Sequence, residues 1–226
     1  MRIAIVRKTA LVSGSDLEAM ARAIERQVAE DLAPAWGISP LPVECYEEEL
    51  APADAWIVRL VVDAGSDDLG WHAEAGSLPF GVVGVAPILQ GGGGALLGAG
   101  PDAPSVSRVL SHEILELLVD PDADSWEPGP NGTEYALEVC DPVEASSYLL
   151  DGCELSDFVG APWFDGQDSR TPGGLSLGPL ELAPGGYAIT RAPDGSPTDV
   201  FGSRRPPDWR LGGHRHAWRH ARQEAT

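Results

Sequence analysis

Residues 105–118, with the sequence SVSRVLSHEILELL, predict a helix that has an apolar side and a polar edge. Ser105 or Ser107 can cap its first turn, because a serine hydroxyl accepts hydrogen bonds from backbone amides without a partner in the helix. The pair Asp120-Pro121 ends it, since proline cannot continue the hydrogen-bond ladder. The apolar residues that would face a core are Val109, Leu110, Leu115 and Leu118. The stretch is therefore typical of an amphipathic helix.

Upstream of this helix, strand-like and helical patterns alternate. Residues 3–6 indicate a short strand, and residues 13–16 offer a turn and an N-cap for a helix that Pro34 would end. The apolar residues of that helix recur with the spacing of one helical face: Leu17, Met20, Ala21, Ile24, Val28 and Leu32. Residues 43–46 form a brief extended piece, and the β-branched run 56–62 is typical of a central strand.

Residues 80–86 form another extended stretch. Its two glycines and the closing Pro87 indicate an edge strand, or a strand against which another segment lies closely. A glycine-rich loop of ten residues, 91–100, then leads to the helix at 105–118.

Beyond residue 120 the chain becomes rich in glycine, proline and acidic residues, with short strand-like pieces at 135–139 and 187–190. This order of elements predicts an α+β fold. We expect a core over residues 1–120 and a loop-rich cap over residues 121–203.

The charge of the chain is unevenly distributed. Residues 1–203 contain 9 Lys and Arg against 33 Asp and Glu, a net charge of −24, whereas residues 204–226 contain 6 Arg against 2 acids, a net charge of +4. Such an acidic body repels nucleic acids and anionic membrane surfaces, so we expect neither as a partner. The Arg/His-rich segment 204–226 is predicted to be a disordered end, and contact with an acidic partner is the alternative.

Nothing in the sequence predicts a membrane span, which needs about 18 uninterrupted apolar residues. The apolar run at residues 3–6 is too short for the core of a signal peptide, and Arg7 follows at once. The three cysteines, which share no CxxC spacing and suit a reducing compartment, are Cys45, Cys140 and Cys153. We therefore expect a cytoplasmic protein.

Only two of the five histidines, His72 and His112, lie outside the basic segment 204–226. His112 and Glu116 are four residues apart, so their side chains project from one face of the predicted helix. At that spacing an imidazole nitrogen and a carboxylate oxygen can both reach one metal ion at roughly 2.0–2.2 Å. Glu113 would lie to one side, where it could take a proton from a water molecule.

A zinc site also needs a third ligand from elsewhere and an open position for water. Glu138 and Asp141, downstream of Glu116, supply two further carboxylates. His72 could be a ligand or a proton donor, but a histidine beside a tryptophan is more often packed or hydrogen-bonded, and we leave it outside the ligand set. Asp120 is a reserve ligand.

The motif His112-Glu113-x-x-Glu116 resembles a variant of the HExxH motif of the zincin metallopeptidases, and the strand–helix–strands–helix order before it is similar to the zincin core. The resemblance implies a small mixed sheet with two packed helices, with residues 121–203 completing the metal site. In the glutamate-type zincins a glutamate on the following segment is the third ligand, and a nearby aspartate orients the first histidine. By this resemblance Glu138 is the third ligand, and Asp141, also in the metal site, orients His112.

Most of residues 1–190 also resemble a poorly characterised group of bacterial and phage-associated metallopeptidase-like proteins. Besides the motifs at 111–116 and 138–141, the fragments similar to that group are Asp31–Gly37, Gly70–His72 and Gly185–Tyr187. The resemblance implies a zinc-dependent peptidase that acts on a peptide or protein. We expect the substrate to add as a strand to residues 80–86.

The chain departs from the common motif at one position, because Glu116 replaces the second histidine. A carboxylate ligand lowers the Lewis acidity of the ion and favours harder ions such as manganese or calcium more than a two-histidine site does. A non-catalytic, metal-stabilised binding or accessory protein on the same scaffold is therefore the alternative. A metal-dependent enzyme that modifies peptides without hydrolysing them is a third possibility.

Two other patterns do not predict a site. Residues 174–178 match the GxSxG motif of serine hydrolases, but the prolines around them leave no strand before and no helix after. The glycine-rich loop is not a phosphate-binding P-loop, because Lys8 is the only lysine of the chain.

Overall fold

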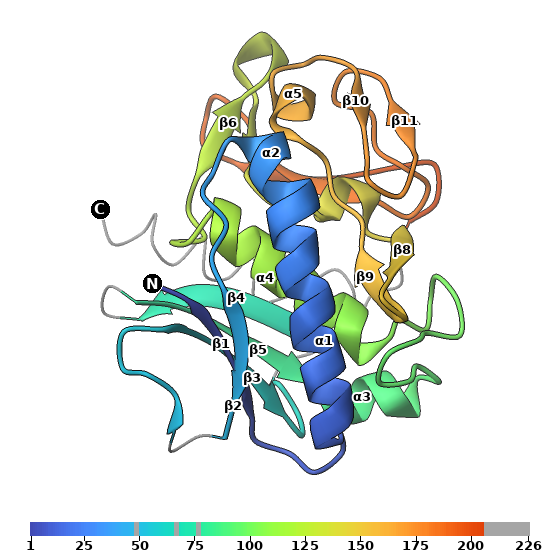
Figure 1. The fold of residues 1–226 in the computed structure, drawn as a ribbon. Helices are drawn as coiled ribbons and strands as arrows, with labels where there is room; N and C mark the ends of the chain where they lie inside the picture. Colours follow the sequence, from blue (N-terminus) through green and yellow to red (C-terminus); the bar gives the residue numbers. More distant parts are fainter. Residues whose placement is uncertain (48–49, 66–67, 76–77, 206–226) are drawn as a thin grey trace.

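The computed structural model describes residues 1–47, 50–65, 68–75 and 78–205, and it confirms the α+β fold (Figure 1). A mixed five-stranded sheet has the order β2-β1-β3-β5-β4. Its parallel strands pair as β2-β1-β3-β5, and β4 runs antiparallel to β5. The strands are β1 (Ile3–Arg7), β2 (Val43–Tyr46), β3 (Trp56–Val61), β4 (Gly70–Ala75) and β5 (Leu78–Gly84).

The first helix begins as predicted but ends later. The Ser13 hydroxyl accepts a hydrogen bond from the Asp16 amide and caps α1 (Gly14–Gln27). A π-helical turn, Val28–Leu32, then connects α1 to α2 (Ala33–Trp36). The prediction that Pro34 ends the helix is wrong. Pro34 occupies the first turn of α2, where the absence of a proline N–H removes few helical hydrogen bonds. The helix ends instead at Gly37, which has a left-handed φ of 65°.

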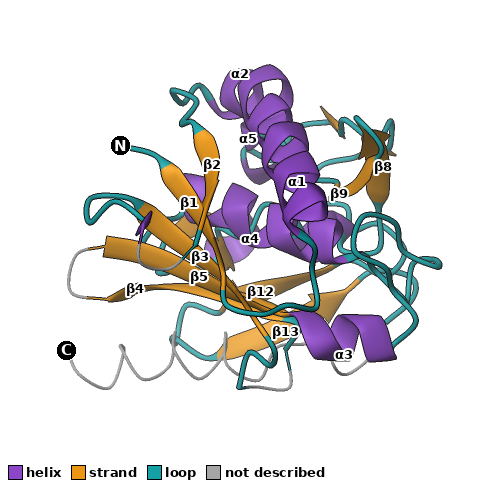
Figure 2. Cartoon of the chain, turned by 60° about the horizontal axis from the view of Figure 1, so that its bottom comes forward, coloured by secondary structure: helices purple, strands orange, loops and turns teal. Residues whose placement is uncertain are grey.

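The helix predicted at 105–118 is α4 (Val106–Val119), and Ser105 caps it by accepting a hydrogen bond from the Arg108 amide. Helices α1 and α4 both lie over one face of the sheet (Figure 2). The apolar side chains between these layers are buried: Ile3, Ile5, Val58, Leu60 and Val83 from the sheet, and Met20, Ile24, Leu110 and Ile114 from the helices. The same core cluster continues into the C-terminal half, so the predicted core and cap share one hydrophobic interior.

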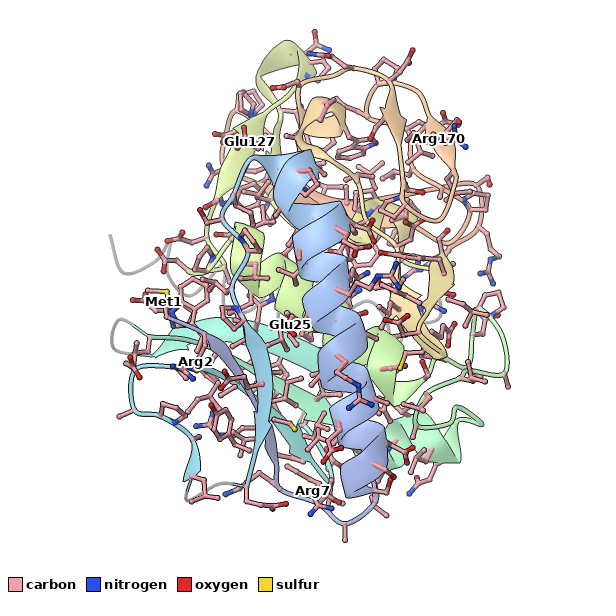
Figure 3. All side chains as sticks on the ribbon, in the orientation of Figure 1. Met1, Arg2, Arg7, Glu25, Glu127 and Arg170 are labelled. Atoms are coloured by element: carbon pink, nitrogen blue, oxygen red, sulfur yellow. The ribbon has the colours of Figure 1, made fainter. Side chains whose placement is uncertain are left out.

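Side chains fill the space between α1 and the sheet, whereas Arg2 and Arg7 lie at the two ends of β1 (Figure 3). Arg2 forms an ion pair with Glu44 at 2.9 Å, and Arg7 forms one with Glu47 at 2.6 Å. These exposed or half-buried pairs connect β1 to β2 and to the residue that follows it, and such surface pairs contribute little stability.

The expectation that residues 80–86 form an edge strand is wrong. Strand β5 lies between β3 and β4, so both of its edges are hydrogen-bonded, and β4 is the edge strand of the sheet. The two glycines instead fit the alternative interpretation that another segment lies closely against this strand. A Cβ on Gly81 would lie 3.2 Å from Val58 Cγ1, and one on Gly84 would lie 2.8 Å from the Ala64 amide nitrogen. After Gly84 the chain forms a helix, α3 (Val85–Gln90).

The C-terminal half is rich in loops, with short strands and helical turns. Its elements are β6 (Trp126–Pro128), a 3₁₀ turn (Pro130–Gly132), β7 (Glu134–Ala136), a 3₁₀ turn (Asp141–Val143), β8 (Ser147–Leu150), β9 (Cys153–Ser156), α5 (Ala161–Phe164), β10 (Ser169–Arg170), β11 (Ser176–Leu177), β12 (Tyr187–Arg191) and β13 (Pro197–Phe201). A four-stranded sheet has the order β13-β12-β7-β6, and β8 pairs with β9. The predicted strand-like pieces correspond to β7 and β12.

In the basic segment predicted to be disordered, residues 206–226 lie outside the described part of the chain. Arg204, at its start, forms an ion pair with Asp102 at 3.0 Å. In the portion of the chain that the structure describes, no helix is long and apolar enough to cross a membrane.

Glu154 on β9 connects the glycine-rich loop to the start of α4. Its Oε2 accepts hydrogen bonds from the amides of Gly98 at 2.7 Å and Ser105 at 3.3 Å, and its Oε1 accepts one from the Ser147 hydroxyl at 2.8 Å. Arg108 Nη1 lies 3.5 Å from Oε1. Burial would raise the pKa of Glu154, but the Ser147 hydrogen bond, the Arg108 charge and the amides outweigh it and lower that pKa.

We predict that Glu154→Ala lowers the free energy of unfolding by about 1–3 kcal/mol, because it leaves buried donors without their acceptor. Since the carboxyl pKa is lowered by folding, this difference from the parent is fully present above the ordinary carboxyl pKa. It disappears as the pH falls through the folded pKa. Chemical denaturation at several pH values measures it. Glu44→Ala, which removes an exposed ion pair with Arg2, is the control and should change stability by less than about 1 kcal/mol. An equal effect of both substitutions would contradict the prediction.

Candidate metal centre

The structure places the ionisable edge of α4 in the protein interior. His112 Nε2 lies 3.1 Å from Glu116 Oε2, as the spacing of four residues predicts. Every side chain from Val106 to Leu118 is buried, the polar ones included. A buried charged group is costly unless other groups or ions compensate it, so the surroundings of this edge decide its chemistry.

The segment after β7 brings further ligand atoms to His112. The Asp141–Val143 turn places Asp141 Oδ1 3.5 Å from His112 Nε2, and Glu144 Oε2 lies 3.1 Å from His112 Nδ1. The Cys140 amide donates a hydrogen bond to Glu116 Oε1 at 3.3 Å, and the Cys140 thiol donates one to the His112 carbonyl at 3.9 Å. Cys140 and Glu144 were not predicted from the sequence, although both lie within three residues of the predicted Asp141.

His72, which was not among the predicted ligands, reaches the same cluster from the edge strand β4. Its Nδ1 lies 3.4 Å from Glu113 Oε2 and 3.9 Å from Glu116 Oε2, and its Nε2 lies 3.9 Å from Glu138 Oε2. The signal that could have included it is its rarity, since His72 and His112 are the only histidines before the basic segment. Its neighbour Trp71 packs instead against Phe80, with ring centroids 5.3 Å apart.

Three groups of buried or half-buried residues could hold a metal ion, and in each group one ligand atom per residue lies within 4.8 Å of the others. The groups are His112, Glu116 and Cys140; His72, Glu116 and Glu138; and His112, Asp141 and Glu144. The predicted residues Glu138 and Asp141 thus both belong to the cluster, but to different groups. Asp120, the reserve ligand, belongs to none of the three. Its carboxylate accepts hydrogen bonds from the Ser125 amide and hydroxyl at 3.0 and 2.8 Å.

The carboxylates dominate the electrostatics of this cluster. Burial lowers the pKa of His112, but the negative charges of Glu116 and Glu144 and contact with Asp141 outweigh it, so that its pKa lies well above the ordinary value. Burial likewise opposes protonation of His72, yet Glu113, Glu138 and Glu116 raise its pKa. The cluster therefore attracts positive charge, whether protons or a metal cation.

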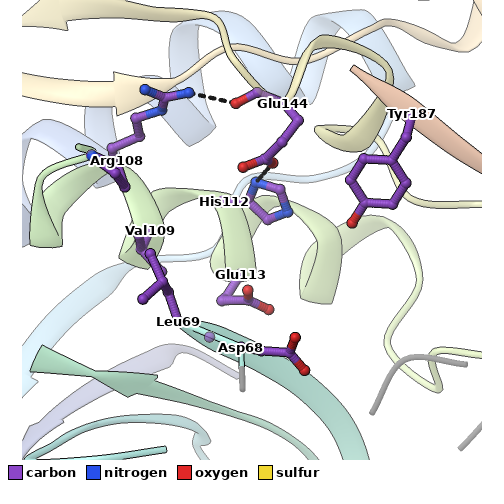
Figure 4. A pocket seen from close by; sticks show the side chains of 10 residues that line it. Asp68, Leu69, Arg108, Val109, His112, Glu113, Glu144 and Tyr187 are labelled. Atoms are coloured by element: carbon purple, nitrogen blue, oxygen red, sulfur yellow. Dashed lines mark hydrogen bonds and ion pairs between the residues drawn. The ribbon is translucent and has the colours of Figure 1, made fainter. Parts of the chain in front are cut away.

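Glu113 lines a small pocket of about 40 Å³ together with His112, Glu144 and Tyr187. Figure 4 shows that His112 and Glu113 project from α4 into the pocket. Tyr187, on β12, and Asp68 line other sides of it. The residues before β4 complete its wall, which brings the edge of the sheet to the same place as the ligand cluster. The pocket thus offers access to a site whose residues are otherwise buried.

Gly70, the first residue of β4, allows Glu113 to lie against the backbone of the edge strand. A Cβ at this position would lie 2.8 Å from Glu113 Oε1 and 2.9 Å from its Cγ, closer than real Cβ contacts. Any larger residue at position 70 would therefore displace the Glu113 side chain or the strand.

No family model, no curated protein and no solved structure matches this chain.

We predict that Gly70→Ala lowers the free energy of unfolding by about 1–3 kcal/mol through this overlap. In a Glu113→Ala background the same substitution should cost much less, because the overlapping atoms are gone. Denaturant unfolding of the four proteins gives the coupling energy. Gly14→Ala is the control, since nothing lies within 4 Å of its added Cβ. An equal cost of Gly70→Ala in both backgrounds would show that Glu113 does not lie against Gly70.

Proposed function

We propose that this protein is a metal-dependent hydrolase of the zincin-like type and that it cleaves peptide bonds. The observation that carries the proposal is the placement of Glu113 in the pocket, on the same helix as the His112–Glu116 pair. A base next to a cation site is the minimum arrangement for metal-assisted hydrolysis.

In this proposal His112 and Glu116 hold the ion, with Cys140 and Asp141 nearby as further donors. The donor set of imidazole, carboxylate and thiol fits zinc, while its carboxylates also admit manganese or, less favourably, calcium. When bound, the ion would supply Lewis acidity toward the substrate carbonyl and an attacking water.

Glu113 would act as the general base and then as the general acid. Its carboxylate would accept a proton from the attacking water and return it to the leaving amine. His72 supports this role, since its Nδ1 lies 3.4 Å from Glu113 Oε2 and, with Gly70 on the same strand, confines the carboxylate. Exclusion of bulk water from a buried site strengthens such electrostatic interactions.

The edge strand β4, rather than residues 80–86, would bind the substrate. Among the described residues β4 pairs with β5 alone, and its first residue, Gly70, lines the pocket. An extended peptide that adds to this edge by main-chain hydrogen bonds would therefore run past Glu113. This geometry favours an unstructured peptide segment as substrate over a small molecule.

Glu113→Gln tests the catalytic role. We expect the variant to keep the metal content of the parent and to lose hydrolysis of an unfolded protein substrate by about 10²–10⁴-fold, the contribution of a general base. Elemental analysis and a fluorescent casein assay measure the two properties. Glu25→Gln, the same chemical change at an exposed position of α1, is the control and should behave as the parent. Equal hydrolysis by the parent and Glu113→Gln would remove Glu113 from its role.

Chelation tests the metal site itself. We expect a chelator to lower the melting temperature of the parent and added zinc to restore it. A ligand present at about 100-fold its Kd stabilises the folded state by roughly 2.7 kcal/mol. His112→Gln should reduce this response, and Glu25→Gln should keep it. A melting temperature indifferent to chelator would contradict the proposal. A chelator-sensitive protein without hydrolytic activity would instead be the metal-stabilised binding or accessory protein.

A further inference from the structure

Glu116 is the residue that two of the ligand groups share. Its Oε2 lies 3.1 Å from His112 Nε2 and 3.9 Å from His72 Nδ1. The first group adds Cys140 to His112 and Glu116, and the second adds Glu138 to His72 and Glu116. The two imidazoles come from different elements, α4 and the edge strand β4, and meet at this one buried carboxylate.

A single ion position does not account for both groups. Of the groups found in the described part of the chain, none joins His112 with His72 or with Glu138. The donors of these two groups therefore surround two neighbouring positions that have Glu116 in common. Carboxylate-rich sites of this kind hold two ions about 3.5–4 Å apart in many hydrolases.

The geometry around His72 supports a role as a ligand. Its side chain is only 2% exposed, and in the described structure neither ring nitrogen has a hydrogen-bond partner. The separations of 3.4 Å from Nδ1 to Glu113 and 3.9 Å from Nε2 to Glu138 exceed ordinary hydrogen-bond lengths. Buried polar atoms are nearly always satisfied, and a metal ion is a common partner of a buried imidazole.

We propose that the cluster binds two divalent cations, one between His112 and Glu116 and the other between His72 and Glu138, with Glu116 as the shared carboxylate. The inference rests on the proposed function only for the ion at His112. It adds a second ion and gives Glu138 and His72 the role of its ligands. Imidazole and carboxylate donors suit zinc and manganese.

Two ions would also offset the loss of Lewis acidity that is expected when Glu116 stands in place of a second histidine. On a single ion this carboxylate would donate its whole negative charge and weaken the Lewis acidity. As a bridge it divides that charge between two cations, so each keeps more of its polarising power.

Metal stoichiometry tests the proposal. We expect elemental analysis after saturation with zinc and removal of excess to give two ions per chain for the parent. His72→Gln and His112→Gln should each give one. Trp71→Phe is the matched control, because it alters the same edge strand on the side that packs against Phe80, and it should keep two ions.

Loading the parent with manganese provides a second measurement that does not need a variant. Two ions joined by a carboxylate should give the multiline electron paramagnetic resonance spectrum of a coupled pair, whereas separate ions give a simple six-line spectrum. His72→Gln should convert the first spectrum to the second. If that variant fails to fold, the spectrum and the stoichiometry of the parent decide the question.

One ion per chain in the parent, an uncoupled spectrum, or two ions retained in folded His72→Gln would overturn the second site. One ion with hydrolysis that depends on Glu113 would overturn it and leave the proposed function standing. Two ions without hydrolysis would overturn the proposed function and support the second site. A parent that binds no ion would overturn both.

Discussion

The burial of an ionisable helix edge is the constraint on which the rest of this structure depends. Helix α4 is enclosed between the sheet and the C-terminal half, so His112, Glu113 and Glu116 cannot rely on bulk water for solvation. Carboxylates in such a place must find donors, protons or cations, because an uncompensated buried charge costs several kcal/mol. The segment 138–144 brings further carboxylates to α4, and the edge strand β4 brings His72, so the compensating charge must come from protons or cations.

The surrounding fold holds this edge in position at the start of α4 and beside Glu113. At its start, Glu154 links the glycine-rich loop and the first turn of α4, while the Ser107 hydroxyl donates to the Glu154 carbonyl at 2.7 Å. Near the ligand cluster, Gly70 lets the backbone of β4 approach Glu113. A site built on a packed helix and a paired strand keeps its geometry better than one built on loops alone.

The ligand cluster carries more negative charge than a two-histidine zinc site. The cluster is strongly anionic because it contains Glu116, Glu138, Asp141 and Glu144. These negative charges also raise the pKa of both imidazoles. A more anionic site binds cations more strongly but makes a single bound ion a weaker Lewis acid. In the proposed two-ion site, sharing of Glu116 between the ions would reconcile these opposing effects, and the position of His72 would then matter as much as that of His112.

Local signals in the sequence determined the α+β class, the start of α1 at Ser13, the start of α4 at Ser105 and the proximity of His112 to Glu116. Caps and helical periodicity depend on neighbours within a few residues, so they can be read without the fold. Only the tertiary structure decided that β4, not residues 80–86, is the sheet edge, that Glu138 and Asp141 lie in different ligand groups, and that His72 faces Glu116. Strand order and the meeting of side chains from β4, α4 and the segment 138–144 are set by pairing and packing between distant residues, which no short stretch of sequence records.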